Sequence, residues 1–251
     1  MGSEMCIRDR VTLVPGYNEG SFHAVVTNEE TGIVYSIAPN AKGEMMVSER
    51  HQTGFGREIR PVDANTLNEG FDPLETSLND QIKNATDAST LDTELSTIDV
   101  LVLWTTDAEC RNANETRGCT ITSNTTAAMR GTIDIAIEIT NEAYKESGIH
   151  AEVNLVYAYL DHTYQETAGE PFMPALEHVA KKGDGRTDKV HEFRELYGAD
   201  IVAMIIDDEN DNFCGKAYIG PRRNAMFSVI RWDCAAAVYS FGHELSHTMV
   251  R

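Results

Sequence analysis

VLVLW at residues 100–104 is an unbroken apolar run. Such a run, without polar alternation, is typical of a strand that neighbouring elements bury on both faces. Two more strands are expected further along the chain, at residues 153–160 and at residues 201–206 (IVAMII), and helical patterns lie between the three. Strands that alternate with helices predict right-handed crossovers and a parallel sheet core.

The first helical pattern is the longest one. It runs from about residue 125 to 147, where Met129, Ile133 and Ile137 recur every four residues and Gly148 supplies a stop. Further along the chain we expect two short helices at about residues 175–182 and 188–197, two short β segments at residues 217–219 and 227–232, and a last helix that opens near Ala235.

The chain before residue 98 has a different composition and a different pattern of apolar residues. Residues 11–72 contain short β-like runs, and residues 28–32 resemble a hairpin loop. This region has too few apolar residues for a large core of its own. Residues 73–97 are rich in Thr, Asp, Asn and Ser, and they are predicted to form a linker or a loosely ordered helix. Residues 1–10 lack the features of a signal peptide and resemble a sequencing-adapter remnant, so we exclude them from the expected fold.

The composition of the chain argues against some classes of protein and partner. The chain has 251 residues, enough for one large domain or two small ones, and no apolar run approaches the length of a membrane-spanning helix. It has 40 acidic and 21 basic residues and a formal net charge of −19. A surface this acidic repels phosphate backbones, which argues against nucleic acid as a partner. The sequence does not indicate an oligomeric state.

Four cysteines lie outside the excluded segment, at positions 110, 119, 214 and 234. None of them has the Cys-x-x-Cys spacing of a structural zinc or redox site. An even number in two local pairs predicts disulfides Cys110–Cys119 and Cys214–Cys234, and hence an oxidising compartment. The alternative is four buried free thiols.

The sequence His243-Glu244-Leu245-Ser246-His247 lies on the last expected helix. Histidines at positions i and i+4 project from one face, so both imidazoles can bind one zinc ion. Glu244 lies beside the first ligand, where it could act as the general base on a water molecule that zinc activates. The opposite face is apolar and is expected to pack on the sheet. The alternative reading is a surface helix with two incidental histidines.

The order of motifs around this helix resembles the metzincin peptidases, most closely the secreted reprolysin-like (adamalysin-type) group. The resemblance begins at YGADIV (residues 197–202) and continues through CGKAYIG (residues 214–220) and FSVI (residues 227–230). It ends with Cys234-Ala235 and then SFGHEL (residues 240–245), and it extends more loosely back to about residue 97.

The resemblance implies a secreted zinc endopeptidase that acts on protein or peptide substrates. The implied fold is α/β (α+β), a mixed, mostly parallel twisted sheet with an antiparallel edge strand and an active-site helix, preceded by a small β-rich region. The edge strand, near residues 217–219 or 227–230, would bind an extended substrate by β-addition. Residues 98–251 would be the catalytic domain. Residues 11–72 would be the end of a propeptide, although a plain accessory β-domain also fits.

The sequence departs from the family pattern in ways that leave alternatives open. The family continues with a glycine turn and a third histidine, but here the glycine position holds Val250 and the sequence stops at Arg251. We therefore expect a C-terminally truncated domain with impaired activity. Two alternatives are a zinc peptidase with a Glu ligand further downstream, and a non-catalytic binding module that has lost the metal.

Other candidate residues have weaker signals. Alternate oxygens in residues 207–212 (DDENDN) could bind Ca²⁺, but an EF-hand loop has a glycine where Asn212 stands, and a solvated loop is favoured. Four further histidines lie at positions 150, 162, 178 and 191, without the spacing of metal ligands. We interpret them as ordinary surface side chains or as side chains with satisfied hydrogen bonds.

Overall fold

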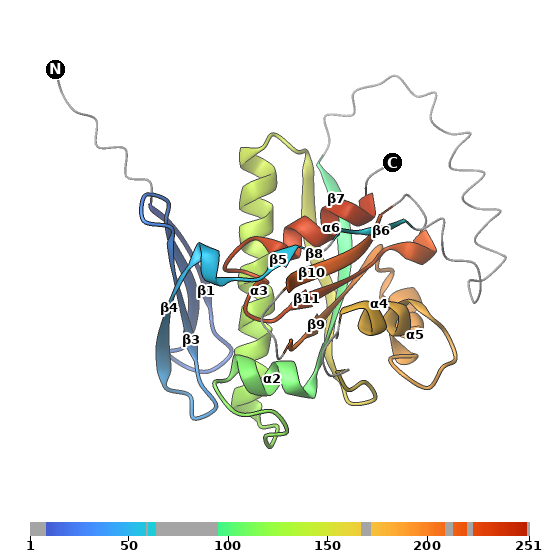
Figure 1. Ribbon diagram of the computed structural model, residues 1–251, viewed down its shortest axis with the longest axis horizontal. Helices are drawn as coiled ribbons and strands as arrows, with labels where there is room; N and C mark the ends of the chain where they lie inside the picture. Colours follow the sequence, from blue (N-terminus) through green and yellow to red (C-terminus); the bar gives the residue numbers. More distant parts are fainter. Residues whose placement is uncertain are drawn as a thin grey trace.

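The computed structural model describes residues 9–58, 60–63, 95–166, 172–208, 213–219 and 223–249. Two β-sheets lie on opposite sides of one long helix, α3 (Ser123–Glu146), as Figure 1 shows. A capping box between Thr122 and Thr125 opens this helix. Gly148, with φ 69, follows its last turn and provides the predicted stop.

The central sheet has the strand order β5-β10-β11-β9-β7-β8, and β6 also pairs with β10. Its members are β5 (Arg57–Glu58), β6 (Val62–Asp63), β7 (Ser96–Thr105), β8 (Ala151–Asp161), β9 (Ile201–Ile206), β10 (Phe213–Ile219) and β11 (Phe227–Arg231). Strands β8, β7, β9 and β11 run parallel, whereas β10 runs antiparallel to β11. The mixed sheet and the three predicted strands β7, β8 and β9 are confirmed, and β8 is only partly buried.

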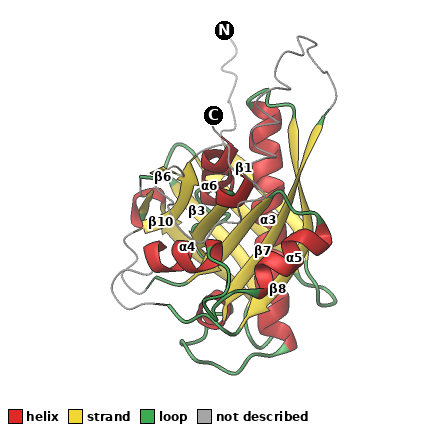
Figure 2. Ribbon diagram, turned by 90° about the vertical axis from the view of Figure 1, so that its right-hand side faces the viewer, coloured by secondary structure: helices red, strands yellow, loops and turns green. Residues whose placement is uncertain are grey.

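Helices cover both faces of this sheet. One face packs on α3 and α6 (Ser240–Met249), and the other packs on α4 (Phe172–Ala180) and α5 (Lys189–Tyr197), which face the viewer in Figure 2. Every residue of β9 is buried, because its side chains alternate between these two cores. A short helix that the sequence analysis did not predict, α2 (Thr106–Asn112), follows β7. The Thr105 side chain caps it by accepting from the Ala108 amide.

The N-terminal sheet is antiparallel, with strands in the order β1-β2-β3-β4. Its members are β1 (Asp9–Pro15), β2 (Phe22–Asn28), β3 (Ile33–Pro39) and β4 (Met45–His51). Val25 and Val34 join the core on the α3 side of the central sheet, so this sheet shares the core of its neighbour. The predicted hairpin loop is present, and Gly32, with φ 66, closes it.

The structure corrects two boundaries of the sequence analysis. Asp9 and Arg10 belong to β1, where they lie opposite Asn28 and Thr27, although we excluded residues 1–10. Ser96 and Thr97 belong to β7 and not to a linker, because they pair with β8. The rest of the expected linker, residues 73–94, lies outside the described residues, as do residues 1–8.

Candidate active site

The segment before α6 is a series of turns and not the start of the helix. The sequence analysis placed the start near Ala235, but α6 begins at Ser240. The alanines at positions 235–237 are buried in the turns instead, and Tyr239 has a left-handed φ of 62°. The disulfide Cys214–Cys234 ties this segment to β10, and the second predicted disulfide, Cys110–Cys119, is also present.

On α6 the two motif histidines converge. The Nε2 atoms of His243 and His247 are 3.0 Å apart, and their rings are nearly perpendicular. Two zinc–nitrogen bonds of about 2.0–2.1 Å at the tetrahedral angle would separate their nitrogens by roughly 3.3 Å, so a small adjustment would let the pair bind one ion. His243 is exposed and His247 is half-buried, which leaves the pair open to solvent on one side. The two imidazole nitrogens therefore fit zinc as a pair of its ligands.

Glu244 lies on the face of α6 that packs on β10. Its side chain is fully buried, and it fits there because Gly215 of β10 has no side chain. A Cβ atom at Gly215 would come within 2.5 Å of Glu244 Oε1. The sequence analysis gave Gly215 no role, although a glycine inside a strand signals a close approach of this kind.

The other side of α6 fixes the helix in place. Phe241 and Leu245 are fully buried in the core that α6 shares with α3. Gly242 lies so close to α3 that a Cβ atom there would come within 2.9 Å of Thr140. The Ser246 hydroxyl donates to the Gly242 carbonyl and lies 3.3 Å from the Tyr144 hydroxyl, whose pKa is raised by burial. Packing therefore sets the position of the histidines.

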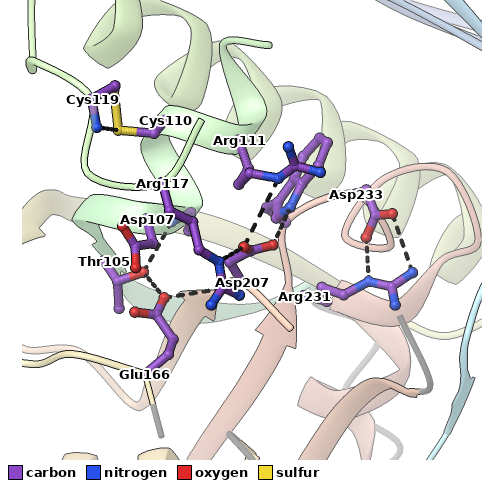
Figure 3. A network of polar contacts seen from close by, with 12 residues as sticks. Thr105, Asp107, Cys110, Arg111, Arg117, Cys119, Glu166, Asp207, Arg231 and Asp233 are labelled. Atoms are coloured by element: carbon purple, nitrogen blue, oxygen red, sulfur yellow. Dashed lines mark hydrogen bonds and ion pairs between the residues drawn. A yellow bond between two sulfur atoms is a disulfide. The ribbon is translucent and has the colours of Figure 1, made fainter. Parts of the chain in front are cut away.

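Polar contacts hold the turns before α6 to the rest of the domain (Figure 3). The Arg231 guanidinium, fully buried, bonds Asp233, and Asp233 also pairs with Arg50 of the N-terminal sheet. The Trp232 indole N–H donates to Asp207 at the end of β9, at 2.9 Å. Arg50 and Asp207 are far in the sequence from these turns, and no local pattern could have predicted their contacts with Asp233 and Trp232.

Asp207 is the centre of a second group of contacts in Figure 3. Arg117 Nε donates to it at 2.6 Å, and Arg111 Nε lies 4.0 Å away. Glu166 bonds the Thr105 hydroxyl and accepts from the Asp207 amide, and burial raises its pKa. Asp207 and Asp208 are buried, which corrects the expectation of a solvated loop. The remaining residues of the candidate Ca²⁺ run, 209–212, lie outside the described residues.

Metal-ligand groups elsewhere are not evident. Across the described parts of the chain, no set of three or more His, Cys, Asp and Glu side chains could hold a metal ion. His150 and His162 are exposed, His178 pairs with Asp184, and His191 is buried with Nε2 3.2 Å from the Lys181 carbonyl oxygen. In the same described parts, no helix is long and apolar enough to cross a membrane.

Strand β10 is the antiparallel strand at this side of the sheet, and its outer edge is occupied. Residues 57 and 58 of β5 pair with it in parallel, opposite Phe213 and Gly215. Residues 62 and 63 of β6 continue the pairing opposite Tyr218 and Ile219. The second strand that we considered as an edge, residues 227–230, lies inside the sheet between β10 and β9. The N-terminal region therefore covers the only candidate edge next to α6 that the described residues offer.

The mixed sheet and the helix-borne His-Glu-x-x-His motif agree with the metzincin resemblance of the sequence. Residues 130–250 match the family described as Metallo-peptidase family M12B Reprolysin-like. This part of the chain is therefore similar to reprolysin-like metallopeptidase domains.

Two relatives are named peptidyl-Asp metalloendopeptidase. The one from Xanthomonas campestris is 31% identical over 120 residues, and one from Stenotrophomonas maltophilia is 30% identical over 120 residues. Each match covers 47% of this chain, and the chain spans only 28% of either relative. The crystal structure of metalloproteinase-II from Bacteroides fragilis overlaps 94% of this chain and 70% of its own, with a TM-score of 0.41 and 11% identity.

Proposed function

We propose that this protein is a zinc-dependent endopeptidase in which His243 and His247 bind the metal and Glu244 is the general base. The observation that carries the proposal is the 3.0 Å approach of the two imidazole nitrogens on one face of α6. The family match over residues 130–250 supports it independently. Two histidines do not complete a tetrahedral site, so we also propose that a further ligand comes from outside the described residues.

When bound, zinc would polarise the scissile carbonyl and lower the pKa of water toward neutrality. The chain's own residues would do the rest. Glu244 would accept a proton from the attacking water and deliver it to the leaving amine. Its burial against Gly215 would hold the carboxylate in one position, and the packing of Phe241 and Leu245 would hold the helix. A free edge of β10 would align the peptide by backbone hydrogen bonds.

Zinc titration and a peptidase assay of His243→Ala test this proposal. We expect the variant to lose zinc and peptide hydrolysis together, because it lacks one of the two convergent ligands. A variant at an exposed histidine outside the motif, His150→Ala, serves as the matched control and should keep both. Zinc binding without hydrolysis in the parent protein would favour a non-catalytic module. Unchanged zinc affinity in His243→Ala would refute the ligand assignment.

We also propose that residues 11–72 act as a propeptide-like cover. The parallel pairing of β5 and β6 with β10 supports this, because it uses the edge that a substrate strand would need. The two disulfides, Cys110–Cys119 and Cys214–Cys234, support export to an oxidising compartment, and we propose that the protein is secreted.

The cover can be tested at Gly56, which contacts β10 directly. A Cβ atom there would come within 2.5–2.7 Å of the Phe213 backbone, so Gly56→Ala should push the segment off the edge. The nearest atom to a Cβ at Gly54 is 3.5 Å away, which makes Gly54→Ala the control. We expect Gly56→Ala to hydrolyse a casein substrate faster than Gly54→Ala does. Equal rates would mean that residues 57–63 do not obstruct the site.

The names of the relatives suggest a substrate. We propose a preference for peptide bonds next to aspartate, supported by the 30–31% identity to two peptidyl-Asp metalloendopeptidases. Matched peptides that differ only by Asp or Asn at one position would test it. Equal cleavage of the two would remove aspartate specificity and leave the endopeptidase proposal intact.

A further inference from the structure

His23 projects from β2 of the N-terminal sheet directly onto the backbone of α3. The side chain is 98% buried, at 2% exposure. A Cβ atom at Gly131 of α3 would lie 2.0 Å from its Nε2 atom and 2.1 Å from its Cδ2 atom. The imidazole therefore fills the space that any other residue at position 131 would occupy. The pair is a point of close contact between sheet and helix.

The site around His23 offers no partner for a charged ring. Among the described residues, Nε2 has no hydrogen-bond partner. A cavity of about 400 Å³ adjoins the ring, and its charged lining groups are Arg50 of β4, Arg111 of α2 and Asp233 of the turns before α6. Arg50 and Asp233 pair with each other, so neither is left to compensate an imidazolium. Burial lowers the pKa of His23 to about 4.

Besides Val25 and Val34, which join the core on the α3 side, several polar contacts link the sheet to the domain. Arg10 pairs with Glu146 of α3, and the Thr12 hydroxyl donates to Glu142. Further bonds join Asn18 to Asn124, Asn124 to the Ala41 carbonyl, and the Ala41 amide to the Ala113 carbonyl. Partly exposed pairs of this kind each contribute little to the free energy of docking. The cavity also shows that the interface is not densely packed.

From this geometry we propose that the N-terminal sheet is released from α3 in mild acid, and that protonation of His23 against Gly131 is the trigger. A cation at this place would be buried and would have no hydrogen-bond acceptor at Nε2. The ring would therefore leave the helix to become hydrated, and the sheet that carries it would move away from α3.

The direction of the pH dependence follows from proton linkage. A histidine that is free in water has a pKa near 6.5, so the released sheet binds a proton that the docked sheet resists. Docking therefore weakens as the pH falls from about 6.5 toward 4. At pH 4.5 the equilibrium constant for docking of the sheet should be roughly 10- to 100-fold lower than at pH 7. Asp134, on α3 next to Tyr17, works in the opposite direction. Burial raises its pKa, so its protonation in acid favours the docked state.

The release has a consequence that rests on the proposed covering role. The chain runs from β4 through residues 52–56 into β5, so a sheet that leaves α3 also pulls on the segment that occupies the edge of β10. The release itself can be measured without any peptidase assay, so failure of the release and failure of the proposed function are distinguishable.

Hydrogen exchange and tryptophan quenching of the 251-residue protein test the release. Trp232, one of two tryptophans, lines the interface cavity, whereas Trp104 is buried in the central core. Between pH 7 and pH 4.5, acrylamide quenching of Trp232 should rise. Exchange of amides in residues 9–51, corrected for its intrinsic pH dependence, should accelerate roughly 10- to 100-fold relative to β7 and β9.

Variants separate this account from general acid unfolding. His23→Gln cannot titrate and should abolish most of the acid effect. His23→Leu, also unable to titrate, is the second variant if glutamine does not dock at pH 7. Gly131→Ala should release the sheet already at pH 7, because its Cβ atom collides with the ring. His191→Gln is the matched control, since burial also lowers the pKa of His191 to about 4, but in the catalytic domain.

The proposal requires that His191→Gln keeps the acid effect and that the His23 variants lose it. If the parent protein shows no acid-dependent exchange in residues 9–51, the proposal is wrong. It is equally wrong if a docked His23 variant retains the full pH dependence of the parent.

Discussion

Strand β9 of the central sheet is buried at every position, whereas strand β4 of the N-terminal sheet is exposed at all but one. Helices cover both faces of the central sheet, and its core is continuous on each side. The N-terminal sheet has one face against α3 and, among its described residues, contributes Val25 and Val34 as buried members of a core cluster, with Val14 packed against it. The comparison teaches that the central sheet provides the scaffold of the site, while the N-terminal sheet is a layer attached by one face, which we propose can be displaced.

The largest expected difference between the sheets concerns stability. Leu103 of β7 is fully buried, so Leu103→Ala should lower the unfolding free energy of the whole domain by about 2–5 kcal/mol. Val34 of β3 is almost as buried, at 1% exposure, but Val34→Ala should cost only about 1–2 kcal/mol and mainly loosen the N-terminal sheet. Native-state hydrogen exchange by mass spectrometry resolves the two. A uniform loss of protection in both variants would contradict the idea of a separable layer.

A smaller change is expected where the central sheet meets the active-site helix. Gly215→Ala should displace the Glu244 carboxylate, because the new Cβ atom would collide with it at 2.5 Å. We expect peptide hydrolysis to fall by roughly 10- to 100-fold at unchanged zinc content. The comparison is with Gly54→Ala, where the nearest atom to a Cβ atom is 3.5 Å away. Equal activity in Gly215→Ala and the parent protein would show that Glu244 does not need this position.

The smallest effect is expected at the contact between the two regions. Arg50 is 40% exposed at its side chain and pairs with Asp233, so Arg50→Gln should weaken docking of the N-terminal sheet by no more than about 1 kcal/mol. The measurement is the exchange rate of amides in β1 to β4, which should rise a few-fold at low salt and less at high salt. An effect as large as that of Leu103→Ala would mean that this ion pair, and not His23, dominates the interface.

The sequence was most informative where the structure depends on local patterns. The apolar runs of β7 and β9, the long helix α3 with its stop at Gly148, and the two cysteine pairs were all predictable from residues close in the chain. The start of α6 was placed too early, because the alanines at positions 235–237 favour a helix in isolation but are buried in turns here. Contacts with Asp207 and β10 decide the conformation of those turns.

The candidate site was predictable only in part for the same reason. The spacing of His243 and His247 follows from helix geometry and could be read directly. The roles of Gly215, Asp233 and Arg50 depend on contacts between segments that lie far apart in the chain, and no periodicity encodes them. The pairing of residues 57–58 and 62–63 with β10 is likewise tertiary, and those short segments have no strand signal of their own.

The most direct test of the account is the Glu244→Gln variant, assayed for zinc content and for turnover of a casein substrate. Glu244 is proposed to act on the attacking water and not to bind the metal, so zinc content and folding should stay near those of the parent protein. Turnover should fall by about 10²- to 10⁴-fold, the loss expected for a positioned general base. If Glu244→Gln retains zinc and hydrolyses the substrate at the rate of the parent protein, Glu244 is not the base and the proposed mechanism is wrong.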